Sequence, residues 1–258
     1  MCLIFLSINN HSNYKLILAG NRDEFYQRKT ASANFWKDHS QVIGGRDLEA
    51  GGTWLAMTKA GKIAMVTNYR DPRNINPMAP SRGHLVSDFL IQDEGPEAYL
   101  ENISSNGKKY NGFNLIVGDP AALWYCSNYK AGIGRLSSGF YGLSNHLLET
   151  PWPKVLRGKE KMKPILGNSI IDPEMVFEIL YDDQVAVDNL LPDTGLPLER
   201  ERALSSMFIK TEGYGSRCST VILIDKNNDV LFSERVYDFT TFQYTTQTFE
   251  FPLEVMEK

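Results

Sequence analysis

The chain has 258 residues, 42% of them hydrophobic and 22% charged, and its formal net charge is −4. This composition predicts a globular protein with a substantial core, and we expect one domain over residues 1–258. The charge excludes a strongly basic surface for nucleic acid or for anionic membranes. No apolar run approaches the roughly 20 residues of a membrane helix, and no basic segment marks a secretory signal. We therefore expect a cytoplasmic protein without stable membrane insertion, and the sequence leaves its oligomeric state open.

The first third of the chain predicts β-strands. Residues 2–8 and 14–20 are short β-type runs on either side of a turn-rich cluster of Asn and Ser, which favours a hairpin. Residues 53–58 and 62–69 form a second such pair. The segment 44–52 is rich in glycine, which lets a backbone take unusual dihedral angles or approach a ligand closely. We expect this segment to be a loop that borders a ligand site.

The middle of the chain predicts helices, and its end predicts strands. Helical spacing occurs at residues 82–91, 96–103, 152–166 and 173–181. Ser81 is available to cap the first of these helices, and Asp172 before Pro173 gives the last one an N-cap and a first-turn proline. β-type runs lie at residues 113–117, 123–126, 220–224, 230–237 and 243–249, and 190–201 is predicted to be a loop. Strands at both ends with helices between them predict an α+β fold of two antiparallel sheets covered by helices.

Cys2 is the most informative residue because of its position. Cysteine is small enough to permit removal of Met1, which would leave a thiol and a free α-amino group on one residue. Because an α-amino group has a reference pKa of about 7.7–8.0, it can accept the thiol proton near neutral pH, as in N-terminal nucleophilic catalysis. The alternative is a small buried residue that opens a strand. Cys126 and Cys218 are too far apart in sequence to form a metal or redox motif.

Charged residues follow the strand 14–20 directly. A hairpin from Cys2 returns this strand end to the N-terminus, where Arg22 can lower the pKa of the thiol. Asp23 or Glu24 can hold the α-amine by a charge-assisted hydrogen bond. The alternative is an exposed charged turn.

Two asparagines, Asn68 and Asn145, lie at predicted strand ends, where asparagine is disfavoured. Neutral, directional amide donors suit the stabilisation of an oxyanion, although both residues can equally cap turns. Arg217 precedes the strand 220–224 and is either a second cation at the site or a surface residue. The four histidines have no metal-ligand spacing, and no GxSxG, P-loop or GxGxxG motif is present. We therefore predict no metal and no cofactor for catalysis.

Together these segments resemble the NRDE family, the transport-and-Golgi-organization ("Tango") group, named for the sequence at residues 21–24. The matching segments are Met1-Cys2, 18–26, 51–55, 67–69, 110–115, 141–145, 148–152, 213–217, 220–223 and 234–235. They follow one another in the right order over almost the whole chain.

The resemblance implies the N-terminal-nucleophile hydrolase fold, a four-layer αββα sandwich. It also implies a more distant similarity to bile-salt hydrolases and penicillin V acylases. Those enzymes use an N-terminal cysteine, an arginine, an aspartate, two asparagines and a late arginine. The matching positions here are Cys2, Arg22, Asn68, Asn145 and Arg217. The acylases place the aspartate three residues after the arginine, where this chain has Phe25, so Asp23 must substitute or the amine is held differently.

Two functions follow from these residues. The first is hydrolysis of a non-peptide carbon–nitrogen bond in a small-molecule amide, with Trp54, Tyr69 and Trp152 lining the substrate site. The second is binding or transfer of a hydrophobic ligand such as haem on the same fold, because Golgi organization, lipid metabolism and haem movement are linked to the family. A fold alone does not distinguish the two. For haem, Cys2 or His84 would be the candidate axial ligand.

Overall fold

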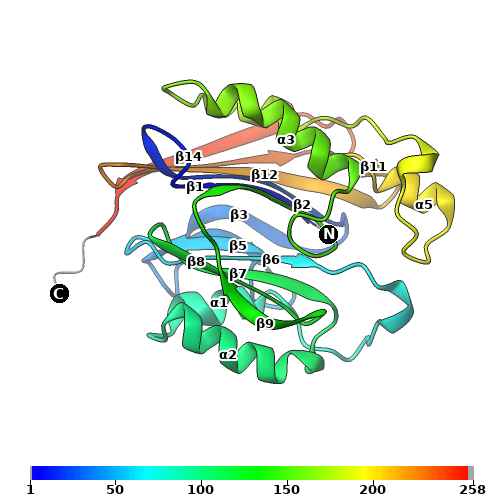
Figure 1. Ribbon diagram of the computed structural model, residues 1–258, viewed down its shortest axis with the longest axis horizontal. Helices are drawn as coiled ribbons and strands as arrows, with labels where there is room; N and C mark the ends of the chain where they lie inside the picture. Colours follow the sequence, from blue (N-terminus) through cyan, green and yellow to red (C-terminus); the bar gives the residue numbers. More distant parts are fainter. Residues whose placement is uncertain (1, 255–258) are drawn as a thin grey trace.

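Two antiparallel β-sheets of seven strands each face one another at the centre of the protein (Figure 1). The computed structural model describes residues 2–254. The first sheet is ordered β10 (Gly139–Leu143), β1 (Cys2–Ile8), β2 (Tyr14–Phe25), β12 (Tyr214–Asp225), β13 (Asp229–Tyr237) and β14 (Tyr244–Pro252), and β11 (Lys210–Thr211) pairs with β12. The second sheet is ordered β3 (Thr30–Phe35), β4 (Val42–Asp47), β5 (Leu55–Thr58), β6 (Ile63–Asn68), β7 (Phe113–Asp119), β8 (Ala122–Ser127) and β9 (Lys130–Arg135).

Helices cover the outer face of each sheet. The helices α1 (His84–Ile91) and α2 (Pro96–Asn106) pack on the second sheet, and α3 (Pro153–Leu166) and α4 (Pro173–Leu180) pack on the first (Figure 1). A short helix, α5 (Leu198–Ala203), lies beyond them, and single turns of 3-10 helix span Pro72–Asn74, Gly107–Lys109 and Asp188–Leu190. The architecture is the predicted α+β sandwich with four αββα layers.

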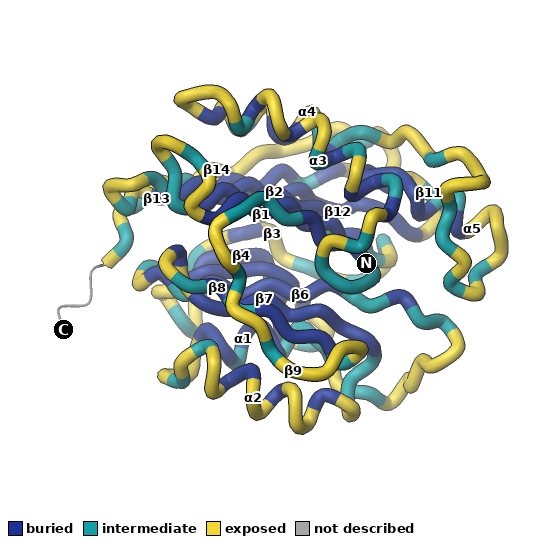
Figure 2. The backbone as a smooth tube through the Cα atoms, in the orientation of Figure 1, coloured by how far each residue is buried: buried dark blue, intermediate teal, exposed yellow. Residues whose placement is uncertain are grey.

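Alternation along the strands divides the core into layers. In β1, Ile4, Leu6 and Ile8 face the second sheet and join the apolar cluster between the sheets. Leu3 and Phe5 face the opposite way and pack under α3 and α4. A third cluster lies between the second sheet and its helices, so the dark, buried chain of Figure 2 runs through both sheets. Each fully buried apolar side chain contributes roughly 1.5–3 kcal/mol to the free energy of folding, and this burial holds the four layers together.

Several predicted elements differ from the structure. The strand predicted at 14–20 continues to Phe25, and β4 takes up part of the segment 44–52 that was predicted as a loop. Strands β3, β9 and β11 and helix α5 were not predicted, and the strand end predicted at Asn145 is that of β10, which ends at Leu143. The Ser81 cap is wrong, because α1 begins at His84 after Gly83 and has no side-chain cap. The Asp172 cap is confirmed, since its Oδ1 accepts a 2.9 Å hydrogen bond from the Glu174 backbone N–H.

Candidate active site

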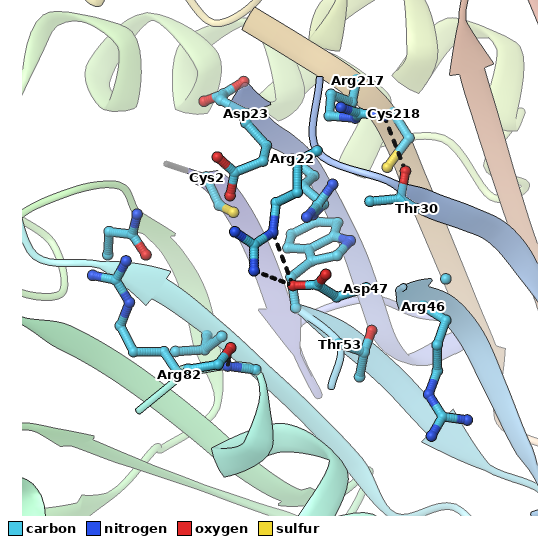
Figure 3. Close-up of a pocket in the computed structure, with 18 of the residues that line it drawn as sticks. Cys2, Arg22, Asp23, Thr30, Arg46, Asp47, Thr53, Arg82, Arg217 and Cys218 are labelled. Carbon is cyan, nitrogen blue, oxygen red and sulfur yellow. Dashed lines mark hydrogen bonds and ion pairs between the residues drawn. The ribbon is translucent and has the colours of Figure 1, made fainter. Parts of the chain in front are cut away.

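A cavity of about 400 Å³ opens at one end of the space between the two sheets. Both sheets and the segment before α1 supply its walls. Its lining includes Cys2, Arg22, Asp23, Glu24, Arg28, Gly45, Arg46, Asp47, Trp54, Asn68, Arg82, Arg217, Cys218 and Glu234. Figure 3 shows Cys2 and Arg22 on one side of this space, with Arg46, Asp47 and Arg82 across it. The predicted ligand-bordering role of the glycine-rich segment agrees with this placement, because Gly45 to Asp47 form part of the wall.

Cys2 is placed by strand register. It pairs with Arg22 of β2, which in turn pairs with Cys218 of β12. Side chains directly opposite one another in neighbouring strands share a face of the sheet, so all three belong to the cavity side. Cys2 is 6% exposed. Burial raises the pKa of its thiol, while the Arg22 charge and a hydrogen bond from the Asp23 backbone N–H lower it.

Asp23 lies one residue further along β2, and its carboxylate therefore lies on the helix side of the first sheet. The side chain is 1% exposed, and Oδ1 accepts a 2.6 Å hydrogen bond from the Ser216 hydroxyl. Burial raises the pKa of Asp23, and the positive charge of Lys154 opposes that rise. Phe25, the position at which the acylases carry their aspartate, is 56% exposed. Asp23 is thus the buried carboxylate nearest to Cys2 along β2.

The two asparagines occupy different positions. Asn68 ends β6 and borders the cavity. Asn145 is fully buried and does not border the cavity; its side-chain amide donates a 3.1 Å hydrogen bond to the Asn68 backbone carbonyl. Its own backbone carbonyl accepts a 2.7 Å hydrogen bond from the Arg70 N–H. Asn145 therefore fixes the end of β6, whereas Asn68 faces the space in which a ligand would bind.

Arg217 borders the cavity but is engaged by the backbone. It sits at the irregularity between Ser216 and Cys218 where β12 shifts register against β2. One guanidinium nitrogen donates hydrogen bonds of 2.6 and 2.9 Å to the carbonyl oxygens of Phe25 and Tyr26. Arg217 thus anchors the turn that leaves the first sheet for the second.

The three predicted aromatic lining residues are also separated. Trp54 borders the cavity and packs over Gly20, where an added Cβ would stand 3.3 Å from the indole ring. Tyr69 stacks on Tyr129 with ring centroids 3.9 Å apart, and Trp152 packs on the outer face of the first sheet. Neither Tyr69 nor Trp152 borders the cavity. The prediction that these two line the substrate site is corrected on that ground, because Tyr69 lies beyond the end of β6 and Trp152 precedes α3.

Glu234 and Cys218 line the cavity and were not predicted. Glu234 is 3% exposed, and its Oε1 accepts a 2.6 Å hydrogen bond from the Ala33 N–H of the other sheet. Burial raises the pKa of Glu234, and hydrogen bonds from Ala33 and Cys218 oppose the rise. The sequence held one signal. Glu234 continues the inward row of Val230 and Phe232 in β13, where a carboxyl group is unexpected.

The histidine considered as a haem ligand lies elsewhere. The His84 ring nitrogen Nε2 is 2.5 Å from the Ala50 carbonyl oxygen, and the residue does not border the cavity. Among residues 2–254 no group of three or more His, Cys, Asp or Glu side chains is arranged to hold a metal ion. No helix in the same range is long and apolar enough to cross a membrane.

The αββα layers, with Cys2 opening an inner strand beside a cavity between the sheets, define the fold class of the N-terminal-nucleophile hydrolases. The Caenorhabditis elegans N-acylethanolamine-hydrolyzing acid amidase ortholog shares this fold, with a TM-score of 0.51, 12% identity, and coverage of 86% of this chain and 92% of that chain. The chain belongs to the family Transport and Golgi organisation 2, whose model matches residues 1–238.

Curated relatives cover the chain almost completely. The Transport and Golgi organization 2 homolog of Mus musculus is 36% identical over 276 residues, spanning 98% of this chain and 100% of its own length. The homolog of Bos taurus is 38% identical over 277 residues, spanning 96% and 99%. The family predicted from residues 21–24 and the other segments is thereby confirmed.

Proposed function

We propose that the protein hydrolyses a non-peptide amide bond of a small molecule in the cytoplasm, with Cys2 as the nucleophile. The observation that carries this proposal is the position of the Cys2 thiol on the wall of the cavity, in register with Arg22 and accepting a hydrogen bond from the Asp23 N–H. Burial leaves the pKa of the Cys2 thiol raised, so the thiol needs a base to lose its proton, and the Arg22 cation and the Asp23 backbone N–H then stabilise the thiolate that forms. The C. elegans amidase ortholog, which shares the fold, is named for amide hydrolysis.

The reaction needs the α-amine of Cys2 as the base. Met1, whose removal would free this amine, lies outside the described residues. In the Met-free chain the amine takes the thiol proton, and the sulfur attacks the carbonyl carbon of the amide. The carbon–nitrogen bond then breaks, the leaving amine takes the proton from the ammonium group, and a thioester with Cys2 remains. Water deprotonated by the same amine attacks this thioester, and the carboxylic acid leaves as the thiol is restored.

The remaining residues divide into contacting and supporting groups. Asn68 borders the cavity, so its amide is the donor we assign to the oxyanion. Asn145 supports Asn68 through the 3.1 Å hydrogen bond to its carbonyl. Arg217 supports the turn after β2, and Arg22 provides the charge beside the thiol. Trp54 provides an apolar wall for the acyl part of the substrate.

Turnover of simple N-acyl amides by protein shown by intact mass to lack Met1 tests this proposal. We expect Cys2→Ala to abolish turnover and a brief reaction to leave an acyl adduct on Cys2. The matched control is Cys126→Ala, because Cys126 is buried outside the cavity lining and burial raises its pKa to about 11. Equal turnover by wild type and Cys2→Ala would contradict the proposal. A haem Soret band that Cys2→Ala abolishes, without any turnover, would favour the binding function instead.

A further inference from the structure

A cluster of buried charges lies behind Cys2, on the helix side of the first sheet. Its members are Asp23 of β2, Lys154 of α3, Arg70 after β6 and Glu201 of α5, with exposed fractions of 1%, 2%, 9% and 3%, and their charges act on one another. None of the last three borders the cavity. Burying an ionised group is costly unless an opposite charge balances it. The two cations and two carboxylates of this cluster must therefore balance one another.

One pair in the cluster is bonded directly. An Arg70 guanidinium nitrogen lies 2.5 Å from a Glu201 carboxylate oxygen, and both side chains are at most 5% exposed. This ion pair is neutral as a unit. Among the described residues, Lys154 is the cation that acts most strongly on Asp23, ahead of Arg70.

Lys154 is unusual in its own right. It lies buried in the first turn of α3, whereas Lys163 in the last turn of the same helix is exposed. Its Nζ atom has no hydrogen-bond partner among residues 2–254. A long apolar side chain would fill this place at a lower desolvation penalty. The ammonium group is therefore explained by a long-range charge interaction rather than by packing or a local hydrogen bond.

The register of β1 and β2 places Asp23 beside the backbone nitrogen of Cys2. Cys2 is opposite Arg22 in antiparallel strands, so the backbone nitrogen of Cys2 lies toward Asp23, the next residue of β2. In the Met-free chain this nitrogen is the α-amine. The Asp23 backbone N–H also donates a hydrogen bond to the Cys2 sulfur. Asp23 consequently adjoins both the base and the nucleophile.

We propose that Lys154 is a positioning residue that keeps Asp23 ionised beneath the α-amine of Cys2, an assignment that rests on the proposed function. An ionised Asp23 accepts a charge-assisted hydrogen bond from the amine and fixes its direction toward the thiol. A protonated Asp23 carries no negative charge and cannot accept a charge-assisted hydrogen bond from the amine. Lys154 thus acts on the reaction through Asp23 and has no contact with the substrate.

The electrostatics of the cluster agree with this assignment. Burial raises the pKa of Asp23, and Lys154 is the first of the groups that oppose the rise. Burial also lowers the pKa of Lys154 to about 8, and Asp23 is the strongest of the groups that raise it. The other charged or titratable groups among the described residues that act on these two are Cys2, Tyr26, Arg70, Glu201 and Tyr214, and the Ser216 hydroxyl donates a hydrogen bond to Asp23.

Carbon-13 NMR of the aspartate carboxyl groups tests the proposal directly, with Asp23→Asn identifying the Asp23 signal. We expect Lys154→Met to raise the titration midpoint of Asp23 by about one pH unit or more. Lys154→Gln should give the same result and serves if the Met variant does not fold. Lys154→Arg should keep the wild-type midpoint because it keeps the charge. Lys163→Met, which removes an exposed lysine from the same helix, is the matched control and should change nothing.

The outcomes separate this inference from the proposed function, because the titration requires no turnover. An Asp23 midpoint that is the same in wild type, Lys154→Met and Lys154→Gln would overturn the role of Lys154 and leave Cys2 chemistry intact. An equal shift in Lys163→Met would overturn it as well, since the effect would then not depend on the buried site. If Asp23 responds to Lys154 but the Met-free protein hydrolyses no amide, the inference stands and the proposed function fails.

Discussion

Loss of Arg70 should destabilise the protein far more than loss of a surface arginine. Arg70 pairs with Glu201 at 2.5 Å, and their side chains are 5% and 3% exposed. Arg70→Met keeps most of the apolar stem but leaves the Glu201 carboxylate buried without its cation. Removing one partner of a buried ion pair costs about 3–5 kcal/mol of the free energy of unfolding. Asp23 lies in the same cluster, and the variant also removes a positive charge that acts on its carboxylate.

Urea unfolding of three variants measures this difference. Arg202→Met is the surface control, because Arg202 pairs with Asp188 at 2.7 Å with side chains 40% and 52% exposed, and such pairs contribute about 0–1 kcal/mol. The double variant Arg70→Met with Glu201→Gln removes both charges and keeps an acceptor for the Thr194 N–H, which Glu201 binds at 3.1 Å. It should regain much of the lost stability. If Arg70→Met is no less stable than Arg202→Met, the reasoning from burial is refuted.

Two further predictions concern packing and pH. Gly158→Ala should cost about 1–3 kcal/mol of the free energy of unfolding by overpacking, because a Cβ there would stand 2.0 Å from the ring of Phe5 in β1. Gly134→Ala is the control in thermal unfolding and should be nearly neutral, because a Cβ there has nothing within 4 Å. Asp47 is partly desolvated, which raises its pKa, but hydrogen bonds from Arg28 and nearby backbone N–H groups outweigh this and leave the pKa lowered. A lowered folded-state pKa contributes stability above the unfolded pKa that is lost as the pH falls. Asp47→Asn should therefore be less stable than wild type at pH 7 and equal to it well below a pH of about 4. A difference in the free energy of unfolding that stays constant across this pH range would contradict the lowered pKa of Asp47.

Elements with strong local signals could be predicted from the sequence. The strand Cys2–Ile8 carries an uninterrupted apolar run, and the helix Pro173–Leu180 has both a capping aspartate and a first-turn proline. These signals lie within a few residues of one another, so no knowledge of the tertiary structure is needed to find them. The α+β class followed from the order of such elements.

Strands that owe their existence to their partners could not be predicted. Half of the residues of the strand Thr30–Phe35 are exposed, and the strand has no apolar alternation, yet it pairs with β4 and its Ala33 N–H donates a hydrogen bond to Glu234 of the other sheet. The strand Lys130–Arg135 contains two glycines and is almost entirely exposed. Strand propensity reflects the surface on which a residue packs, and that surface is absent from a single sequence.

In the candidate site, too, some residues could be placed from the sequence and others depend on strand pairing. Cys2 and Asn68 were predicted at the cavity, and both border it. Asn145 and Trp152 follow β10, a strand at the edge of the first sheet, and the sequence held no information on where in that sheet the strand would pair. Residue type suggested a role for each, but only strand pairing decides which side chains meet at one reacting atom.

The segment Asn21–Glu24 shows why strand periodicity is central to this site. Because β2 continues through the segment, alternate residues face opposite sides of the sheet. Asn21 is fully buried on the helix side, where its amide donates hydrogen bonds of 2.7 and 2.9 Å to the carbonyls of Leu180 and Met207. Arg22 faces the cavity opposite Cys2. One tetrapeptide therefore ties the end of α4 to the sheet and supplies the cation beside the thiol, so the helix layer and the nucleophile are held by the same strand.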